Sequence, residues 1–302
     1  MLLIGSGALA GLLVGYVLQR GDICFHSTFR GVFEHRWALF KTWALGVAIA
    51  AVGLSAVFAI GPWDGLNRGL AFRPVANIVG GLTMGTGMVV AASCNSGLFY
   101  KLGAGMLGAL AGLMGLGAGE LVAGGISLPG PTVLGHGDGA TIPGVLGLPR
   151  IAVAVAIAAA VVLVLFRSAG RQGYKWRWGW PVAGVALGIV TVAAWVLAGV
   201  GGHSFGPSTV GAVESIAGGD PLWWLIAFLA ALVAGSAVGA ITTGAGWIRG
   251  ERPGRYVQLV VGGFLLGGGA KIAGGCNLGH GLSGAAQLNV SSLVVVASII
   301  AG

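Results

Sequence analysis

One stretch of this 302-residue chain occurs twice. Residues 80–97 read GGLTMGTGMVVAASCNSG, and residues 262–279 read GGFLLGGGAKIAGGCNLG. Aligned without a gap, the copies share four glycines, one alanine and a Cys-Asn-x-Gly ending, so that Cys94 corresponds to Cys276. A glycine-rich apolar helix that ends in the same turn in each half of a chain predicts two matched segments that meet at one central site.

Composition predicts a membrane protein. Apolar residues make up 56% of the chain and charged residues 8%, with a mean hydropathy of +0.93. Too little polar surface remains to cover a water-soluble globule of this size, so we expect several crossings of a bilayer and contact with membrane lipids. The 60 glycines lie inside apolar segments, which favours close helix packing and broken helices. The net charge of +8 does not predict a nucleic-acid partner, because the basic residues cluster in short loops that set orientation in a bilayer.

Nine candidate spans follow from a requirement of ~20 apolar residues for each crossing. They are residues 1–19, 37–60, 75–93, 106–127, 150–166, 180–200, 222–243, 256–274 and 284–302. The pattern therefore predicts an all-helical polytopic membrane protein with broken or re-entrant segments.

Loop charge predicts the orientation of these spans. The positive-inside rule places three basic loops in the cytoplasm, namely 20–36, 167–178 and 244–255. Loops 128–149 and 201–221 contain no lysine or arginine and are expected outside. Loop 61–74, with Arg68 and Arg73, is the exception. Alternation through nine spans then puts the N-terminus outside and the C-terminus in the cytoplasm.

The same count makes the repeat inverted, because the second copy lies five spans after the first and so crosses the membrane in the opposite direction. We expect one transmembrane domain built from repeats at approximately 1–127 and 180–302, joined by a connector at 128–179. Such an architecture places a substrate site near the midplane, where the broken helices of the two halves meet at a central constriction.

Cys94 and Cys276 each close a glycine-rich helical run, and each precedes an Asn-x-Gly sequence that favours a turn. Turn N–H groups freed at membrane depth need a partner, and an anion is a suitable one. A neutral thiol adds a weak donor and a polarizable surface, suited to brief contact with a sulfur atom. We interpret the pair, with Asn95 and Asn277, as lining a path for a sulfur-containing anion. The simpler alternative is that each cysteine is a small buried hydrophobe.

Three further residues are candidates for the site. Lys271 lies inside an apolar span, where an ammonium is costly unless it is paired or hydrated, so it is a functional candidate or a partner for Glu120. His280 follows the second cysteine motif, and a ligand role is as reasonable as that of a hydrogen-bonded structural histidine. Cys24 lies in QRGDICFHSTFRG (19–31), a polar loop at the end of the first span. Neither zinc-ligand spacing nor a haem or nucleotide motif is present, so no metal and no cofactor is expected.

Three segments resemble the signature regions of the YeeE/YedE family of bacterial inner-membrane proteins. They are QRGDICFHSTFRG, GGLTMGTGMVVAASCNSGLFYKLGAG and GGFLLGGGAKIAGGCNLGHGLSG. The resemblance implies uptake of thiosulfate through an inner-membrane transporter rather than an enzyme. It further implies a relay of hydrogen bonds from the thiols of Cys24, Cys94 and Cys276 to the sulfur of the anion. A small TusA-like sulfur-carrier protein on the cytoplasmic side is the partner that the family implies.

This sequence departs from the family at two places. Asp22 stands where an arginine or another residue is common, and Gly103, Ala104 and Gly105 stand where relatives often have Gly-Glu-Gly, which leaves Lys101 without a local partner. Two alternatives therefore stay open. One is transport of another sulfur or selenium oxyanion, and the other is a membrane sulfurtransferase that forms a persulfide on a cysteine.

Overall fold

The computed structural model describes residues 1–66, 69–167 and 178–302. Within these ranges every regular element is a helix, which confirms the predicted all-helical fold. Four of the arginines and lysines behind the predicted orientation lie outside the described residues, namely Arg68, Arg171, Lys175 and Arg177.

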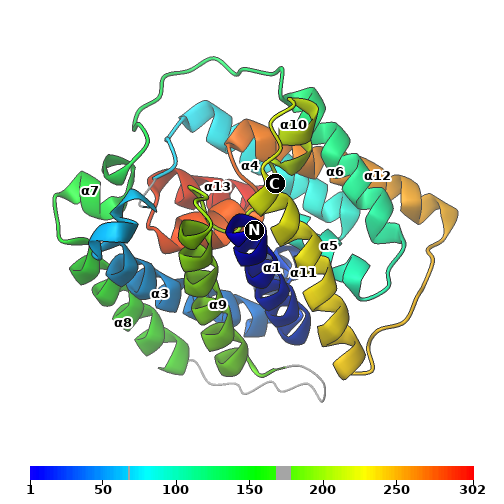
Figure 1. Ribbon diagram of the computed structural model, residues 1–302, viewed down its shortest axis with the longest axis horizontal. Coiled ribbons are helices and arrows are strands. Elements are labelled where there is room, and N and C mark those ends of the chain that lie inside the picture. The colour runs from blue at the N-terminus through cyan, green and yellow to red at the C-terminus, as the bar shows by residue number, and fades with distance from the viewer. Residues whose placement is uncertain (67–68, 168–177) are drawn as a thin grey trace.

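Seven helical segments of the described chain are long and apolar enough to cross a membrane. Their long helices are α1 (Leu2–Gly21), α3 (Ala38–Phe58), α4 (Pro74–Ala91), α8 (Arg150–Arg167), α9 (Trp180–Val200), α11 (Trp223–Thr242) and α12 (Pro253–Ala273). Two shorter apolar helices, α6 (Gly108–Ala123) and α13 (Val290–Ala301), occupy the fourth and ninth expected spans. These helices are labelled in Figure 1. The chain is therefore a multi-pass membrane protein, whereas the count of nine crossings stays a prediction.

Short helices fill the connections. They are α2 (Phe25–Phe33), α5 (Asn95–Gly103), α7 (Ile142–Leu146), α10 (Ala212–Ala217), the 3₁₀ turns η1 (Gly61–Leu66) and η2 (Asp138–Ala140), and the π-helical turn η3 (Gly279–Gly284). The last span is shorter than predicted because Leu288, with φ of 58°, breaks the helix before α13 begins.

The two glycine-rich helices α4 and α12 cross each other at close range. A Cβ built on Gly80 would lie 2.6 Å from the carbonyl oxygen of Gly269, and one on Gly87 would lie 3.0 Å from that of Gly262. The earlier glycine of α4 thus meets the later glycine of α12, so the helices run antiparallel. In the alignment of the two motifs, Gly80 corresponds to Gly262 and Gly87 corresponds to Gly269. The alignment therefore converts each of the two contacts into the other, as expected for segments related by a two-fold axis.

The helices around this crossing pack in matching pairs. α1 packs on α11 and α9 packs on α3, while α6 packs on α12 and α13 packs on α4. Glycines make the close approaches: Gly7 faces the backbone of Trp224, and Gly15 faces that of Leu232, so α1 and α11 run parallel. Small residues let helix backbones approach where lipid provides no hydrophobic drive for association.

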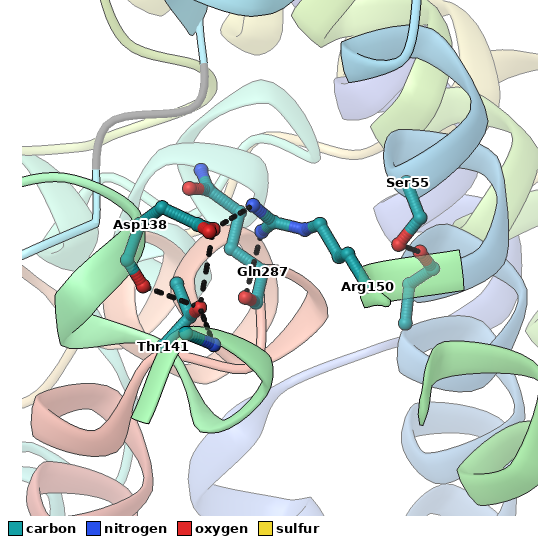
Figure 2. Close-up of polar contacts among 7 residues, drawn as sticks. Ser55, Asp138, Thr141, Arg150 and Gln287 are labelled. Carbon is teal, nitrogen blue, oxygen red and sulfur yellow. Dashed lines mark hydrogen bonds and ion pairs between the residues drawn. The ribbon is translucent and has the colours of Figure 1, made fainter. Parts of the chain in front are cut away.

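α8 belongs to the predicted connector and lies at the edge of the molecule against α3 (Figure 1). Arg150, the first residue of α8, attaches this helix to the second half of the chain. The Arg150 guanidinium donates to the carbonyl oxygen of Gln287 at 2.8 Å and lies 3.3 Å from the Asp138 carboxylate. Figure 2 shows the guanidinium between these two groups, with Thr141 donating to the Asp138 carbonyl at 2.7 Å. The connector is therefore attached by polar contacts at one end.

Candidate functional site

Both glycine-rich helices break in the same way two residues before a cysteine. The C-cap residue of α4 is Ala92, whose φ and ψ are 44° and 41°, and the C-cap residue of α12 is Gly274, with 81° and 21°. This left-handed conformation costs an alanine ~1–2 kcal/mol, so the surrounding contacts must hold Ala92 in place. The breaks turn the chain so that the N-terminal end of a new helical segment follows each cysteine, with its free N–H groups exposed to the site.

The thiol of Cys94 lies in a cradle of backbone donors. Its sulfur accepts from the N–H of Gly97 at 3.3 Å and from the N–H of Phe25, on another segment, also at 3.3 Å. The sulfur of Cys24 lies 3.5 Å away. Cys24 is 2% exposed. The predicted loop is present as a short turn between α1 and α2, but its predicted polar setting is wrong for Cys24, because Asp22, with φ of 46°, turns the chain back and carries Cys24 into the interior.

Cys276 has an equivalent cradle. Its sulfur accepts from the N–H of Gly279 at 3.2 Å and from the N–H of Thr209 at 3.3 Å. The hydroxyl of Ser208 lies 3.9 Å from the same sulfur. Both Ser208 and Thr209 belong to the segment between α9 and α10, which the sequence did not identify as part of the site.

The two asparagines connect the cradles. The Asn95 N–H donates to the side-chain oxygen of Asn277 at 3.1 Å, and the Asn277 amide donates to the Ser96 hydroxyl at 3.2 Å. That hydroxyl lies 3.5 Å from the sulfur of Cys94. A continuous series of polar contacts thus joins the residue next to Cys276 to Cys94. The side-chain amide of Asn95 is fully buried and has no hydrogen-bond partner, which leaves it able to bind a polar guest.

A cavity of about 500 Å³, which we name the Lys271 cavity, reaches the Cys276 cradle through Ser208 and Gly279. Its other polar and charged lining residues are Arg73, Glu120, Ser127, Glu214 and Lys271. The Lys271 ammonium lies 2.5 Å from both carboxylate oxygens of Glu214. The predicted pairing of Lys271 with Glu120 is therefore wrong, because Glu120 instead accepts from the N–H of Gly211 at 2.6 Å.

A second cavity, of about 650 Å³, is lined by residues that lie close in sequence to the other cradle, and we name it the Lys101 cavity. Asp22, which follows α1, lines it together with Tyr100, whose hydroxyl donates to the Asp22 carboxylate at 3.2 Å. Lys101 does have local partners, contrary to the sequence-based prediction. Its ammonium donates to the Ala92 carbonyl at 3.2 Å and to the Ser93 hydroxyl at 3.1 Å. This cation therefore compensates the exposed carbonyl end of α4.

The structure separates His280 from the thiols. Its two ring nitrogens lie 2.9 Å from the Ser292 hydroxyl and 3.2 Å from the Ala273 carbonyl oxygen, and the ring is buried. In the described part of the chain, the hydrogen-bond partners of the sulfurs of Cys94 and Cys276 are backbone N–H groups, serine hydroxyls and the Cys24 thiol. Among the described residues, these contacts include no imidazole or carboxylate that could take the proton of a thiol, so the arrangement favours brief hydrogen bonding to an anion over activation of a nucleophile.

The sequence matches a known family and several named proteins. The family described as "Sulphur transport" matches residues 20–302. The chain is 32% identical to a protein named "Thiosulfate transporter TsuA" from Spirochaeta thermophila, over 96% of this chain and 94% of that one. A protein of the same name from Escherichia coli (strain K12) is 25% identical over 93% and 87% of the two chains. "Probable transporter YedE" of the same bacterium is 30% identical over 32% of this chain.

These matches confirm the resemblance to YeeE/YedE proteins, and with the apolar helices they support a transporter role rather than an enzymatic one. The chain belongs to the sulphur transport family.

Proposed function

We propose that this protein takes up thiosulfate across a bacterial cytoplasmic membrane, passing the anion between the Lys271 and Lys101 cavities along Cys24, Cys94 and Cys276. Each thiol makes a transient hydrogen bond to the terminal sulfur of the anion. Asn95 and Asn277 line the narrow part of this path, Lys271 attracts the anion into its cavity, and His280 supports the Cys276 turn. A TusA-like sulfur carrier would receive the imported sulfur in the cytoplasm.

The observation that carries this proposal is the pair of thiol cradles. Moving a divalent anion into a medium of low dielectric is very costly, so a path must supply donors and some positive potential, whereas too much positive charge would trap the ion. Two backbone N–H groups meet the sulfur of Cys94, and two meet that of Cys276, at 3.2–3.3 Å. Several weak sites in series are what passage requires, since binding must be favourable enough to enter and weak enough to leave.

The proposal includes an inverted repeat of residues 1–127 and 180–302, with 128–179 as connector. The reciprocal glycine contacts of α4 with α12, and the matching pairs of surrounding helices, support it. In the proposed orientation the N-terminus lies outside and the C-terminus lies in the cytoplasm. The basic residues on the loop from 244 to 255, which include Arg249, Arg252 and Arg255, support this direction.

Uptake of labelled thiosulfate into proteoliposomes tests the substrate. We expect saturable uptake that unlabelled thiosulfate inhibits more strongly than sulfate, sulfite or selenite. Stronger inhibition by selenite or sulfite would assign the protein to another oxyanion. Label that remains covalently on the protein as a persulfide would instead favour a sulfurtransferase, and an absence of uptake would contradict transport of thiosulfate.

The ion pair in the Lys271 cavity predicts opposite changes in the KM for thiosulfate when each partner is neutralised. Glu214→Gln removes the negative partner of Lys271, so we expect the KM for thiosulfate to fall by roughly threefold to tenfold at low salt. Lys271→Gln leaves Glu214 uncompensated, and we expect the KM to rise by a similar factor. Transport kinetics at two ionic strengths measure both effects. A change in thermal stability with an unchanged KM in both variants would make the pair purely structural.

A further inference from the structure

The two cradles share the same arrangement of backbone donors and differ in side chains, among them the one that precedes the second donor. Cys94 receives the N–H of Phe25, and the residue before Phe25 is Cys24, whose sulfur lies 3.5 Å from that of Cys94. Cys276 receives the N–H of Thr209, and the residue before it is Ser208, whose hydroxyl oxygen lies 3.9 Å from the sulfur. Ser208 therefore occupies at the second cradle the place that Cys24 occupies at the first.

The spacing along the chain agrees with this equivalence. Cys276 follows Cys94 by 182 residues, and Ser208 follows Cys24 by 184. Ser208 also lines the Lys271 cavity, so its hydroxyl is accessible to a solute that enters there. Next to it, Thr209 is 1% exposed, and its hydroxyl has no hydrogen-bond partner. A second polar group that can bind a guest is thus present in the same turn.

We propose that Ser208 is a further residue that contacts the substrate, beside the three cysteines, and that it determines specificity at the Cys276 end of the path. This assignment rests on the proposed function. A hydroxyl is a stronger hydrogen-bond donor than a thiol and suits an oxygen, whereas a thiol is soft and suits a sulfur. The Ser208 and Cys276 pair binds the oxygens and the sulfur of thiosulfate together. The Cys24 and Cys94 pair presents two thiols and favours the terminal sulfur.

The Ser208–Cys276 pair and the Cys24–Cys94 pair therefore differ in how well they distinguish thiosulfate from sulfate. At the Ser208 end, an oxyanion without a terminal sulfur retains the contact with the hydroxyl, so sulfate competes there with thiosulfate. At the Cys24 end, a thiol replaces that hydroxyl, and the nearby Ser96 hydroxyl is already held by the Asn277 amide at 3.2 Å and lies 3.5 Å from the Cys94 sulfur, so sulfate binds more weakly. Rejection of sulfate is then a property of the Cys24 end of the path.

A structural role for Ser208 has to be separated from this one. Its hydroxyl donates to the Val210 carbonyl at 3.1 Å and accepts from the Val210 N–H at 3.3 Å, so it also stabilises the turn. Ser283 holds the same turn from another segment, donating to the carbonyl of Pro207 at 3.2 Å, and it is fully buried. Ser283→Ala is therefore the matched control, because it loosens the turn without removing a group that lines the cavity.

Thiosulfate uptake and its inhibition by sulfate are measured in proteoliposomes for the wild type, Ser208→Ala, Ser208→Cys and Ser283→Ala. We expect Ser208→Ala to raise the KM for thiosulfate about tenfold, the effect of one lost hydrogen bond to an anion. Ser208→Cys keeps the KM for thiosulfate within about threefold of the wild type, and it raises the inhibition constant of sulfate about tenfold, because a thiol is the weaker donor to oxygen. Ser283→Ala leaves unchanged the ratio of the inhibition constant of sulfate to the KM for thiosulfate.

Three results would overturn the assignment of Ser208. They are an unchanged KM in Ser208→Ala, an equal change in Ser283→Ala, and wild-type uptake that sulfate does not inhibit at any concentration. Each of them leaves wild-type thiosulfate uptake intact. A wild type that takes up no thiosulfate would instead refute the proposed function itself, so the two failures are distinguishable.

Discussion

Replacing Cys94 with alanine is expected to lower thiosulfate uptake by about 100-fold or more, which corresponds to ~2.7 kcal/mol on the barrier to passage. The thiol is the point at which Cys24, Ser96 and two backbone N–H groups converge. Alanine removes the donor to the anion and leaves the Phe25 and Gly97 N–H groups in an apolar gap, where each unsatisfied group costs ~1–3 kcal/mol. Cys276→Ala removes the equivalent group of the other cradle and should have an effect of similar size.

Cys94→Ser is the sharper comparison, because serine keeps a donor and loses the soft sulfur. We expect its uptake to lie between that of the wild type and that of the alanine variant, with a larger loss for thiosulfate than for sulfate. The amount of protein in the membrane and its unfolding temperature are measured in parallel. Normal uptake by the alanine variants, at normal expression, would contradict a thiol relay and would favour buried structural cysteines.

The second large effect is expected at the crossing of α4 and α12, where Gly269→Ala should destabilise the protein by about 3 kcal/mol. The added Cβ would lie 2.7 Å from the Gly80 carbonyl oxygen and 2.8 Å from the backbone nitrogen of Met84. Both are backbone atoms of α4, so relief requires the helices to move apart. Because this crossing positions the two breaks before Cys94 and Cys276, we expect uptake to be lost along with stability.

The neighbouring Gly268 provides the matched control for this substitution. A Cβ there would lie 3.6 Å from the carbonyl oxygen of Gly119 and 3.8 Å from the Ala123 side chain, which is ordinary contact. Both variants gain the same helix propensity of up to ~1 kcal/mol, so their difference isolates the helix crossing. Thermal unfolding of the two purified variants measures it. Equal unfolding temperatures would show that α4 and α12 do not approach as closely as described.

The sequence predicted the parts of the site that are encoded locally. The duplicated glycine run and its Cys-Asn-x-Gly ending predict a helix that breaks just before a cysteine, and both helices do break there, at Ala92 and Gly274. These features depend on residues that are neighbours in the chain and on the spacing of the repeated motif, both of which can be read from the sequence. The all-helical class followed in the same way from the apolar segments.

Beyond the meeting of the two repeated segments, the sequence did not predict which distant residues contact the site. Cys24 was expected in a polar loop because of the charged and hydroxyl residues around it, yet a turn at Asp22 brings it against Cys94, 70 residues away. Ser208 was missed because the residues around it do not resemble those around Cys24, although the two lie at equivalent places. The partner of Lys271 was misassigned since any nearby carboxylate could compensate it, and the choice of Glu214 depends on how α10 packs.

The most direct measurement of the central claim is the rate at which a small thiol reagent alkylates each cysteine, with and without thiosulfate. The purified protein is treated with N-ethylmaleimide, and the modified residues are identified by mass spectrometry. Thiosulfate that passes along the sulfurs should slow the modification of both Cys94 and Cys276 at the concentrations that saturate uptake, and sulfate should protect Cys94 much less. Alkylation rates that saturating thiosulfate leaves unchanged at both cysteines would show that the anion does not contact them.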